Sequence, residues 1–202
     1  MKFDISAVIL TMGDRSEALK DSINSIRMQE DSDVEVIVVW NGISPDQSID
    51  AEIHIHSDVN VGIPSGRNLG ASKASRGLIL FLDDDARLLD PELLDKVQET
   101  FDADKSIAIT SLRIIDEDGL TARRHIPRLG SKSEAISGET TSFLGGACVA
   151  RKSAWDQVYG YSGDLFYSME ETDLSWRILN AGWKIFYAAD LLVAHPRTEP
   201  TR

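Results

Sequence analysis

Three consecutive aspartates, Asp83, Asp84 and Asp85, are the residues of this chain best suited to hold a ligand. They follow directly on the apolar run Leu78–Leu82, which is typical of a strand buried on both faces. Neighbouring carboxylates repel one another unless positive charge lies among them. Mg²⁺ is commonly held by one or two carboxylates together with phosphate oxygens, and open α/β sheets bind ligands beyond the carboxyl ends of their strands. The run therefore predicts a cation and phosphate site, with a solvated acidic turn as the alternative.

A second pair of acids, Glu170 and Glu171, opens a predicted helix that runs to Ala181. The helix macrodipole favours ionised carboxylates in the first turn. A carboxylate held in this way is suited to act as a general base near neutral pH. Acids are also frequent in the first turn of ordinary helices, so a purely structural role is the alternative.

The elements that must position these acids alternate along the chain. Patterns typical of strands fall at residues 4–11, 34–40, 52–56, 78–82, 107–110, 143–150 and 184–187; the one at 52–56 alternates polar and apolar residues, as a half-exposed strand does. Helical patterns fall at 15–28, 64–75, 91–100, 153–158 and 170–181. Residues 116–140 are polar and rich in turn formers, which predicts a loop that includes at most a hairpin. Repeated strand–helix units of this length predict an α/β fold, with a doubly wound, mostly parallel sheet in a single domain.

Composition narrows the classes of function. With 202 residues the chain is long enough to bury one substantial core, and its net charge of −12 argues against nucleic acid as a partner. The single cysteine, Cys148, between two apolar neighbours, suits a buried thiol in a reducing compartment. The start of the chain lacks the pattern of a signal peptide, and no run approaches the roughly 18 apolar residues of a membrane span. These features favour a cytoplasmic location, with peripheral contact at the inner face of the membrane as a further option.

Several short segments carry a resemblance to a known family. They are, in chain order, Ser6–Thr11, Glu35–Gly42, Asn60–Gly62, Gly66–Gly70, Phe81–Asp85, Gly145–Ala147 and Glu170–Arg177. In this order and at these separations, they resemble the GT-A-fold glycosyltransferases of family 2, which are inverting nucleotide-sugar transferases. The resemblance extends from Ile5 to His195 and so covers nearly the whole chain.

The resemblance implies a GT-A (Rossmann-like) catalytic domain over residues 1–202, with a nucleotide-binding half at 1–100 and an acceptor and catalytic-base half at 101–202. It implies Mg²⁺ or Mn²⁺ as cofactor and a UDP-, GDP- or dTDP-linked sugar as donor. The acceptor would be a glycan, a lipid-linked intermediate or a small molecule. Many relatives continue beyond the equivalent of His195, so the chain would be either a minimal enzyme or a catalytic core whose C-terminal acceptor half lies elsewhere.

The resemblance also assigns roles to single residues. Glu171, the second acid of its pair, would be the catalytic base. Asp85 would be the principal metal ligand, joined by Asp83 and His195. The residues that would bind the nucleotide sugar are Thr11, Asn41, Arg67, Asp83, Asp84 and Gly146. Trp40 departs from the family pattern, since many members carry an aspartate there; its indole would either stack on the base or pack in the core.

Two other classes of function are compatible with the sequence. The chain could be a non-catalytic module that binds a nucleotide sugar or a glycan, or a metal-dependent phosphotransferase with a nucleophilic aspartate. The aromatic residues before the acidic pair, including Tyr161, Phe166 and Tyr167, could form a platform for a sugar, or they could pack in the core.

Overall fold

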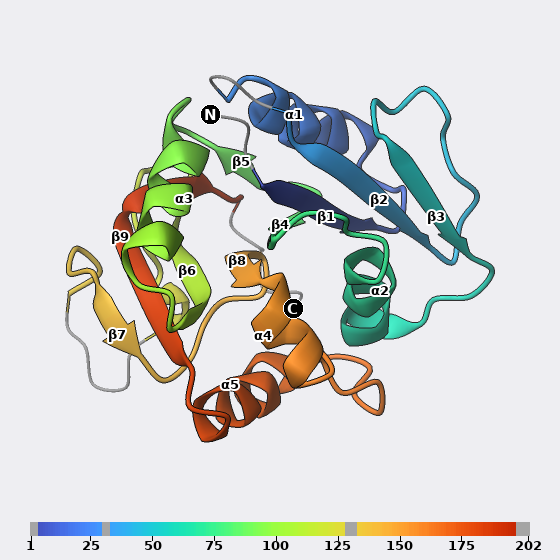
Figure 1. Ribbon diagram of the computed structural model, residues 1–202. Coiled ribbons are helices and arrows are strands. Elements are labelled where there is room, and N and C mark those ends of the chain that lie inside the picture. Colours follow the sequence, from blue (N-terminus) through green and yellow to red (C-terminus); the bar gives the residue numbers. More distant parts are fainter. Residues whose placement is uncertain (1–3, 30–32, 128–132, 197–202) are drawn as a thin grey trace.

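A mixed nine-stranded sheet runs through the computed structural model, which describes residues 4–29, 33–127 and 133–196 (Figure 1). Its strands are β1 (Ile5–Thr11), β2 (Glu35–Asn41), β3 (Ile53–Ser57), β4 (Leu78–Asp83), β5 (Arg87–Leu88), β6 (Ile107–Ile115), β7 (Gly138–Thr140), β8 (Ala147–Arg151) and β9 (Lys184–Ala194). The order is β3-β2-β1-β4-β8-β6-β9-β5, and β7 pairs with β9 beside this path. β1 to β4 are mutually parallel, as are β6 and β9, whereas β8 runs antiparallel between them. The predicted α/β class is confirmed.

Helices cover both faces of the sheet (Figure 1). They are α1 (Ser16–Arg27), α2 (Gly62–Ala71), α3 (Leu93–Ala103), α4 (Lys152–Gln157) and α5 (Glu170–Asn180), with a 3₁₀ turn at Arg123–His125. The apolar stripes of α1 and α3 pack in one core, and those of α2, α4 and α5 pack in a second core on the opposite face. Burial on both faces explains why the central strands read as continuous apolar runs. In the described part of the chain, no helix is long and apolar enough to cross a membrane.

The ends of several elements differ from the prediction. β6 and β9 are longer than predicted, because a register shift after Leu112 lets β9 bulge at residues 189–191 and then resume its pairing. The strand predicted from residue 143 begins only at Ala147, after the Gly145–Gly146 turn. α2 ends before Ser75, whose backbone N–H and hydroxyl both donate to the carboxylate of Glu35. β5 was not predicted, and β7, the strand described within residues 116–140, pairs with β9.

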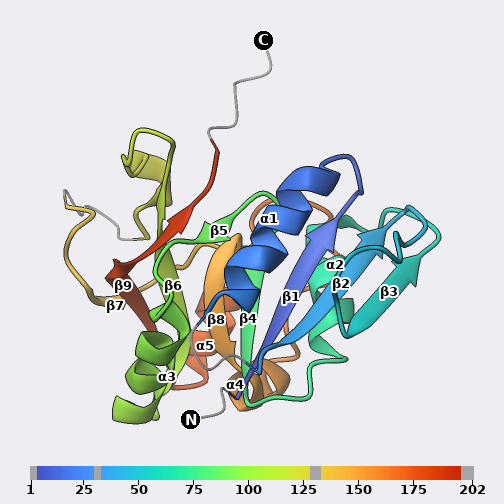
Figure 2. The same cartoon turned by 90° about the horizontal axis from the view of Figure 1, so that it is seen from above.

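The carboxyl ends of β1, β2, β4 and β9 lie on the same side of the sheet, at the ends of these strands (Figure 2). We call this side the edge of the sheet. Thr11, Asn41, Asp83 and His195 stand at or just after the ends of these strands. The topology therefore brings polar residues from near the start of the chain, such as Thr11, together with His195 from near its end.

Close packing of α2 on the sheet depends on glycine. A Cβ atom on Gly70 would lie 2.2 Å from Cγ1 of Val8 in β1, and one on Gly66 would lie 2.5 Å from Cδ1 of Leu10. These approaches hold the middle and the last turn of α2, and with them Arg67, against the sheet.

We predict that Gly70→Ala destabilises the fold. Alanine raises helix propensity by about 1 kcal/mol, but the buried, β-branched Val8 cannot turn away, and overpacking typically costs about 1–3 kcal/mol. We expect a net loss in the free energy of unfolding, measured by urea denaturation. Gly163→Ala is the matched control, because its new Cβ would meet only Ser65 Oγ at 3.7 Å. Equal stability of the two variants would contradict this account of the packing.

Candidate active site

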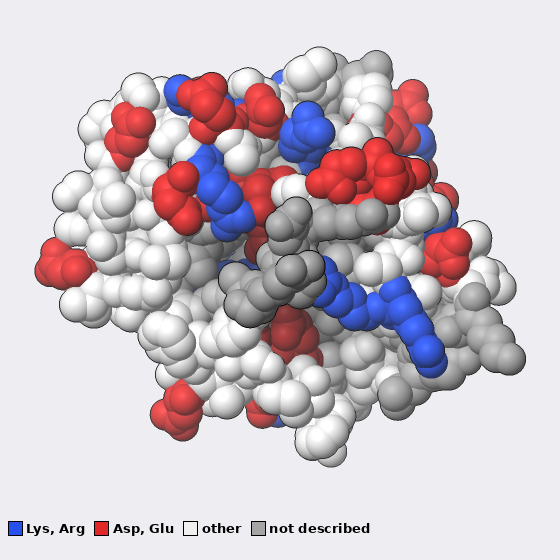
Figure 3. All heavy atoms as spheres, turned by 180° about the vertical axis from the view of Figure 1, so that it is seen from behind, with Lys and Arg blue, Asp and Glu red and all other residues white. Residues whose placement is uncertain are grey.

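The aspartates at the end of β4 point in two directions. The backbone N–H of Asp83 still pairs with the carbonyl of Gly146, and the chain then turns, with the N–H of Ala86 donating to the carbonyl of Asp83. Asp83 and Asp85 face His195, while Asp84 turns back toward Thr11. Figure 3 views the molecule from behind, onto this edge of the sheet, where acidic side chains lie in and around a hollow in the middle of the face.

Two cations hold Asp83 in its ionised form. Nη2 of Arg67 lies 2.7 Å from Oδ1 of Asp83, and Nε2 of His195 lies 3.3 Å from Oδ2. Burial opposes ionisation, yet the hydrogen bond from His195 and the charge of Arg67 together lower the pKa of Asp83 to about 2. Reciprocally, the hydrogen bond to Asp83 raises the pKa of His195 to about 9.

Asp84 is the most enclosed of the three acids, with 2% of its surface exposed. It accepts a hydrogen bond of 2.7 Å from the hydroxyl of Thr11, and Nη2 of Arg15 lies 2.7 Å from its other oxygen. Burial nevertheless raises the pKa of Asp84 to about 6, with a contribution from Asp85 and Asp83. Nη1 of Arg15 pairs with Asp85, so one guanidinium bridges two of the three acids.

The ligand atoms of Asp83, Asp85 and His195 lie within 4.8 Å of one another. The two carboxylates supply the oxygen ligands that Mg²⁺ and Mn²⁺ prefer, and the imidazole adds one nitrogen donor. The three predicted metal ligands are thus brought together, and their chemistry fits such an ion. Asp84, by contrast, lies outside this group.

A cleft of about 680 Å³ opens beside the acids. Its walls are formed by Leu10, Thr11, Met12, Arg15, Asn41, Asn60, Gly62, Ile63, Arg67, Asp83, Asp84, Asp85, Phe166, Tyr167, His195 and Pro196. Five of the six residues predicted to bind the nucleotide sugar lie in this wall; the sixth, Gly146, does not. We call this space the first cleft.

Asn41 has a structural task at the rim of the first cleft. Its Nδ2 donates to Oδ1 of Asn60 at 2.8 Å, and its Oδ1 accepts from the backbone N–H of Val61 at 2.8 Å. These bonds fix the turn that leads into α2. Trp40, next to it, lies in the core at 3% exposure, with its Nε1 bonded to His54. Of the two expected positions of the Trp40 indole, stacked on a base or packed in the core, the structure shows the second.

A second cleft, also of about 680 Å³, lies on the other side of Arg67 and Asp83. Its walls are formed by Ile63, Arg67, Asp83, Ile114, Arg124, His125, Leu144, Gly145, Gly146, Tyr167, Ser168, Met169, Glu170, Glu171 and His195. Oε1 of Glu171 accepts a hydrogen bond of 3.3 Å from the backbone N–H of Gly145. Burial, followed by the charge of Glu170, raises the pKa of Glu171 above that of an ordinary glutamate. Glu171 is therefore a stronger base than an exposed glutamate.

The two glycines before β8 let the backbone approach charged groups. A Cβ on Gly145 would lie 2.4 Å from Nη1 of Arg67 and 2.7 Å from Oε1 of Glu171. A Cβ on Gly146 would lie 2.2 Å from Oδ2 of Asp83. Gly146 therefore contributes by making room for Asp83, and it borders the second cleft rather than the first.

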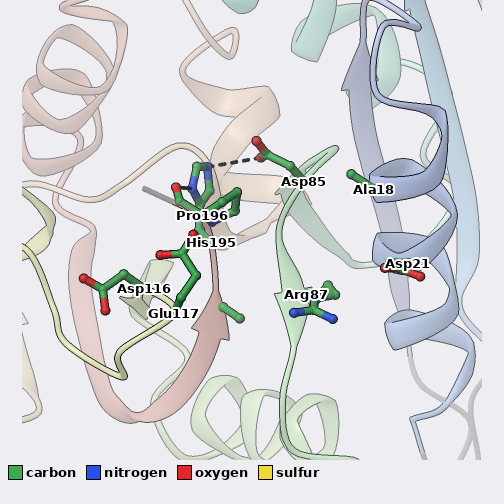
Figure 4. A pocket seen from close by; sticks show the side chains of 9 residues that line it. Ala18, Asp21, Asp85, Arg87, Asp116, Glu117, His195 and Pro196 are labelled. Atoms are coloured by element: carbon green, nitrogen blue, oxygen red, sulfur yellow. Dashed lines mark hydrogen bonds and ion pairs between the residues drawn. The ribbon is translucent and has the colours of Figure 1, made fainter. Parts of the chain in front are cut away.

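A smaller pocket of about 260 Å³ reaches the acids from the side of α1 and β5 (Figure 4). In this view His195, after β9, turns toward Asp85, and Asp116 and Glu117 lie below the pair. Since Asp85 and His195 line both this pocket and the first cleft, the pair forms a partition between them.

Some residues of the site were not predicted from the sequence. The sequence predicts Arg15 as the start of a helix, Asn60 as part of a family segment and Glu170 as the neighbour of Glu171, and it predicts no contact in the site for any of them. Arg15 lies four positions after Thr11, but nothing in that spacing shows that its side chain reaches Asp84 and Asp85. Cys148, predicted as a buried thiol, is confirmed, and burial raises its pKa to about 12.

Comparison with known proteins identifies the family. Residues 6–159 match the family model described as glycosyl transferase family 2, and the chain belongs to this family. Pre-mycofactocin glycosyltransferases of Mycobacterium tuberculosis, from strains CDC 1551/Oshkosh and H37Rv, are each 26% identical over 206 residues, which cover 93% of this chain and 42% of the relative. The chain therefore spans about two fifths of the length of these curated relatives.

Solved structures with low sequence identity share the fold. The mannosyltransferase PcManGT from Pyrobaculum calidifontis, in complex with GDP-Man and Mn²⁺, gives a TM-score of 0.77 at 14% identity, covering 100% of this chain and 59% of that one. GalNAc-T7 with UDP, GalNAc and Mn²⁺ gives 0.75 at 14% identity, covering 98% and 44%. Residues 1–349 of Staphylococcus aureus TarS with UDP give 0.73 at 18% identity, covering 98% and 61%. The predicted GT-A-like fold is confirmed.

We predict that Gly146→Ala weakens the binding of Mn²⁺. The new Cβ would collide with the carboxylate of Asp83 and turn it away from Asp85 and His195. Metal affinity should fall about tenfold or more, as it commonly does when the support of a metal ligand is lost. Calorimetric titration with MnCl₂ measures the effect, with Gly163→Ala as control. Unchanged affinity in Gly146→Ala would show that Asp83 does not depend on this close approach.

Proposed function

We propose that this chain is the catalytic part of an inverting glycosyltransferase that depends on a divalent metal. It would transfer a sugar from a nucleoside-diphosphate sugar to a hydroxyl of an acceptor by a single displacement. One observation carries the proposal. Two clefts of similar size share a wall, with the acidic trio on the side of the first cleft and the basic carboxylate of Glu171 in the second.

The first cleft suits the donor. Its wall offers hydrogen-bonding groups at the strand ends, such as Asn41. It also offers the guanidinium of Arg67, which can form an ion pair with a phosphate. The related structures named above contain UDP or GDP-Man, and a further TarS structure contains UDP-GlcNAc. These ligands support a UDP- or GDP-linked sugar as the donor class, and dTDP-linked sugars are chemically close to the UDP-linked ones because thymine is a methylated uracil.

Asp83, Asp85 and His195 would hold the Mg²⁺ or Mn²⁺ ion, and His195 would first release the proton that makes it a cation beside Asp83. When bound, such an ion stabilises the negative charge that grows on the departing diphosphate. Arg67 adds to this effect, because it is buried at 6% exposure and its ion pair with Asp83 fixes it at the wall between the clefts.

The second cleft suits the acceptor. Oε2 or Oε1 of Glu171 would take the proton of an acceptor hydroxyl as its oxygen forms a bond to the anomeric carbon. The bond from that carbon to the diphosphate oxygen breaks on the opposite face, and the electron pair leaves with the nucleoside diphosphate. Attack opposite to departure inverts the anomeric centre. Because Arg67 and Asp83 border both clefts, the reacting carbon would lie close to them.

This division follows the two halves of the chain only in part. Residues 1–100 supply most of the first cleft, but Phe166, Tyr167 and His195 also line it. Residues 101–202 supply most of the second cleft, together with Ile63, Arg67 and Asp83. Family membership leaves the phosphotransferase alternative without support. A non-catalytic binding module is separated from the proposed enzyme by the experiments below.

We predict that two substitutions separate binding from turnover. Asp85→Ala should abolish metal-dependent binding of UDP and GDP, because it leaves only Asp83 and His195 of the three residues grouped as metal ligands. Glu171→Gln should leave that binding intact and lower kcat by about 10²–10⁴-fold, the usual contribution of a general base.

Thermal shifts with UDP, GDP, ADP and dTDP sugars, with and without Mn²⁺, measure binding, since a ligand at a hundred times its Kd stabilises by about 2.7 kcal/mol. Release of nucleoside diphosphate measures turnover. Full activity in Glu171→Gln would remove this residue from the mechanism, and donor binding without turnover in the wild type would favour the binding module.

We also predict the acid limb of the pH profile. The pKa of Glu171 is raised, so its carboxylate takes up a proton at a higher pH than an exposed glutamate does. As pH falls, the midpoint of the decline in kcat/KM for the acceptor should therefore lie above the ordinary glutamate pKa of about 4.3. The profile is measured at saturating donor and metal. A profile that stays level down to this value would contradict the assignment of Glu171 as the base.

A further inference from the structure

The cations that meet the acidic trio differ in their freedom to move. The side chain of Arg67 is 7% exposed and that of His195 is 17% exposed, whereas the side chain of Arg15 is 50% exposed. Arg67 is also confined by the backbone of Gly145, where a Cβ would lie 2.4 Å from its Nη1. Arg15 stands just before the first turn of α1 and lines the first cleft. Of these three cations, Arg15 is therefore the one that can change its partner with the least loss of packing.

The guanidinium of Arg15 engages one of the predicted metal ligands. Its Nη1 pairs with Oδ2 of Asp85, and its Nη2 lies 2.7 Å from Oδ1 of Asp84. The other oxygen of Asp85 lies 3.3 Å from Nε2 of His195 (Figure 4). Both carboxylate oxygens of Asp85 therefore face a cation of the protein itself.

The charges of the acidic trio are balanced without a metal. Arg15, Arg67 and His195 together meet all three aspartates. A bound divalent ion adds two positive charges to this balanced cluster, and like charges a few ångströms apart repel strongly. Positive charge must then leave the cluster, or negative charge must enter it.

A diphosphate in the first cleft would supply that negative charge. Arg15 and Asp85 line the same cleft, so the phosphates of a donor bound there would lie beside the guanidinium. Arginine presents its N–H donors in a planar fork, which lets one side stay on a carboxylate while the other binds a phosphate oxygen. Asp84 suits the fixed side, because it is 2% exposed and is itself held by the hydroxyl of Thr11 at 2.7 Å.

We infer that Arg15 is an exchangeable counter-ion: its Nη1 leaves Asp85 when a divalent ion is bound and pairs with a phosphate oxygen of the donor, while its Nη2 stays with Asp84. This inference rests on the proposed function and adds Arg15 to the residues that bind the diphosphate. It also gives Asp84, which lies outside the metal group, the role of anchoring the guanidinium. Arg15 thus disfavours the metal alone and favours the metal together with the diphosphate, which makes their binding cooperative.

The test is a calorimetric titration of the whole chain, first with MnCl₂ alone and then with UDP or GDP at saturating MnCl₂. Arg15→Gln should bind Mn²⁺ alone about tenfold more tightly than the wild type, because a charge that repels the ion is removed. The same variant should bind the nucleotide about 10- to 100-fold more weakly, since a charge-assisted hydrogen bond to the diphosphate is lost. The opposite signs are diagnostic: a role in folding would weaken both affinities, and a permanent contact with phosphate would leave the Mn²⁺ affinity unchanged.

A second substitution at the same position separates charge from geometry. Arg15→Lys keeps the charge, but an ammonium group cannot span Asp84 and a phosphate as a planar fork does. Its affinity for Mn²⁺ alone should stay near that of the wild type, while nucleotide binding weakens several-fold. This milder variant tests the contact with the diphosphate even if Arg15→Gln does not fold.

Arg27→Gln is the matched control, because it removes the same charge from the other end of α1. The side chain of Arg27 is 27% exposed, pairs with Asp50 and Glu52, and lines neither cleft. At an ionic strength of about 0.15 M, charges more than about 8 Å apart are largely screened. Arg27→Gln should therefore bind Mn²⁺ and nucleotide as the wild type does.

Two results would overturn the inference: Mn²⁺ binding by Arg15→Gln that is unchanged or weaker, or nucleotide binding that neither substitution of Arg15 weakens. A wild type that binds neither UDP nor GDP in the presence of Mn²⁺ would count against the proposed function itself. Intact binding by the wild type, together with either of the two results, would count against the exchange by Arg15 alone.

Discussion

Mutual repulsion among Asp83, Asp84 and Asp85 is the constraint on which the rest of this structure depends. Three carboxylates at the end of one strand are stable only if cations from elsewhere reach them. Arg15 comes from the start of α1, Arg67 from the middle of α2 and His195 from the end of β9. Each cation meets at least one acid, and together they neutralise the cluster from different sides. The fold therefore has to bring three distant segments to the end of β4.

The close approaches follow from this constraint. Arg67 reaches Asp83 because α2 lies directly on β1 and β2, and that distance is set by Gly66 and Gly70. On the other side, Gly145 and Gly146 bring the backbone before β8 against Arg67 and Asp83. Side chains at these positions would push the charged groups apart. Glycine in this chain is thus as much a determinant of the electrostatics as the charged residues are.

How far the sequence predicts the structure depends on the range of the interaction. The buried strands and the amphipathic helices follow from local periodicity, and Asp83, Asp85 and His195 meet because parallel strands end at one edge. The bridging role of Arg15 depends on side-chain direction, which spacing does not encode. The extension of β9 was missed because Asp190 interrupts the apolar pattern, and only the bulge at residues 189–191 shows how the strand continues past it. The core position of Trp40 likewise could not be predicted, because it depends on the hydrogen bond of its Nε1 to His54.

The loop at residues 164–169 connects the two clefts physically. Phe166 lines only the first cleft, Met169 lines only the second, and Tyr167 lines both. The carbonyl of Phe166 is bonded to the first turn of α2, which carries Arg67, while the carbonyl of Met169 accepts from the N–H of Asp173 in the first turn of α5, which carries Glu171. A loop tied in this way to both helices cannot shift at one end without strain at the other, because Ser168 and Met169 already occupy a costly backbone region. The strained backbone therefore holds two groups in a fixed relation: Arg67, which borders both clefts, and the carboxylate of Glu171, which borders the second.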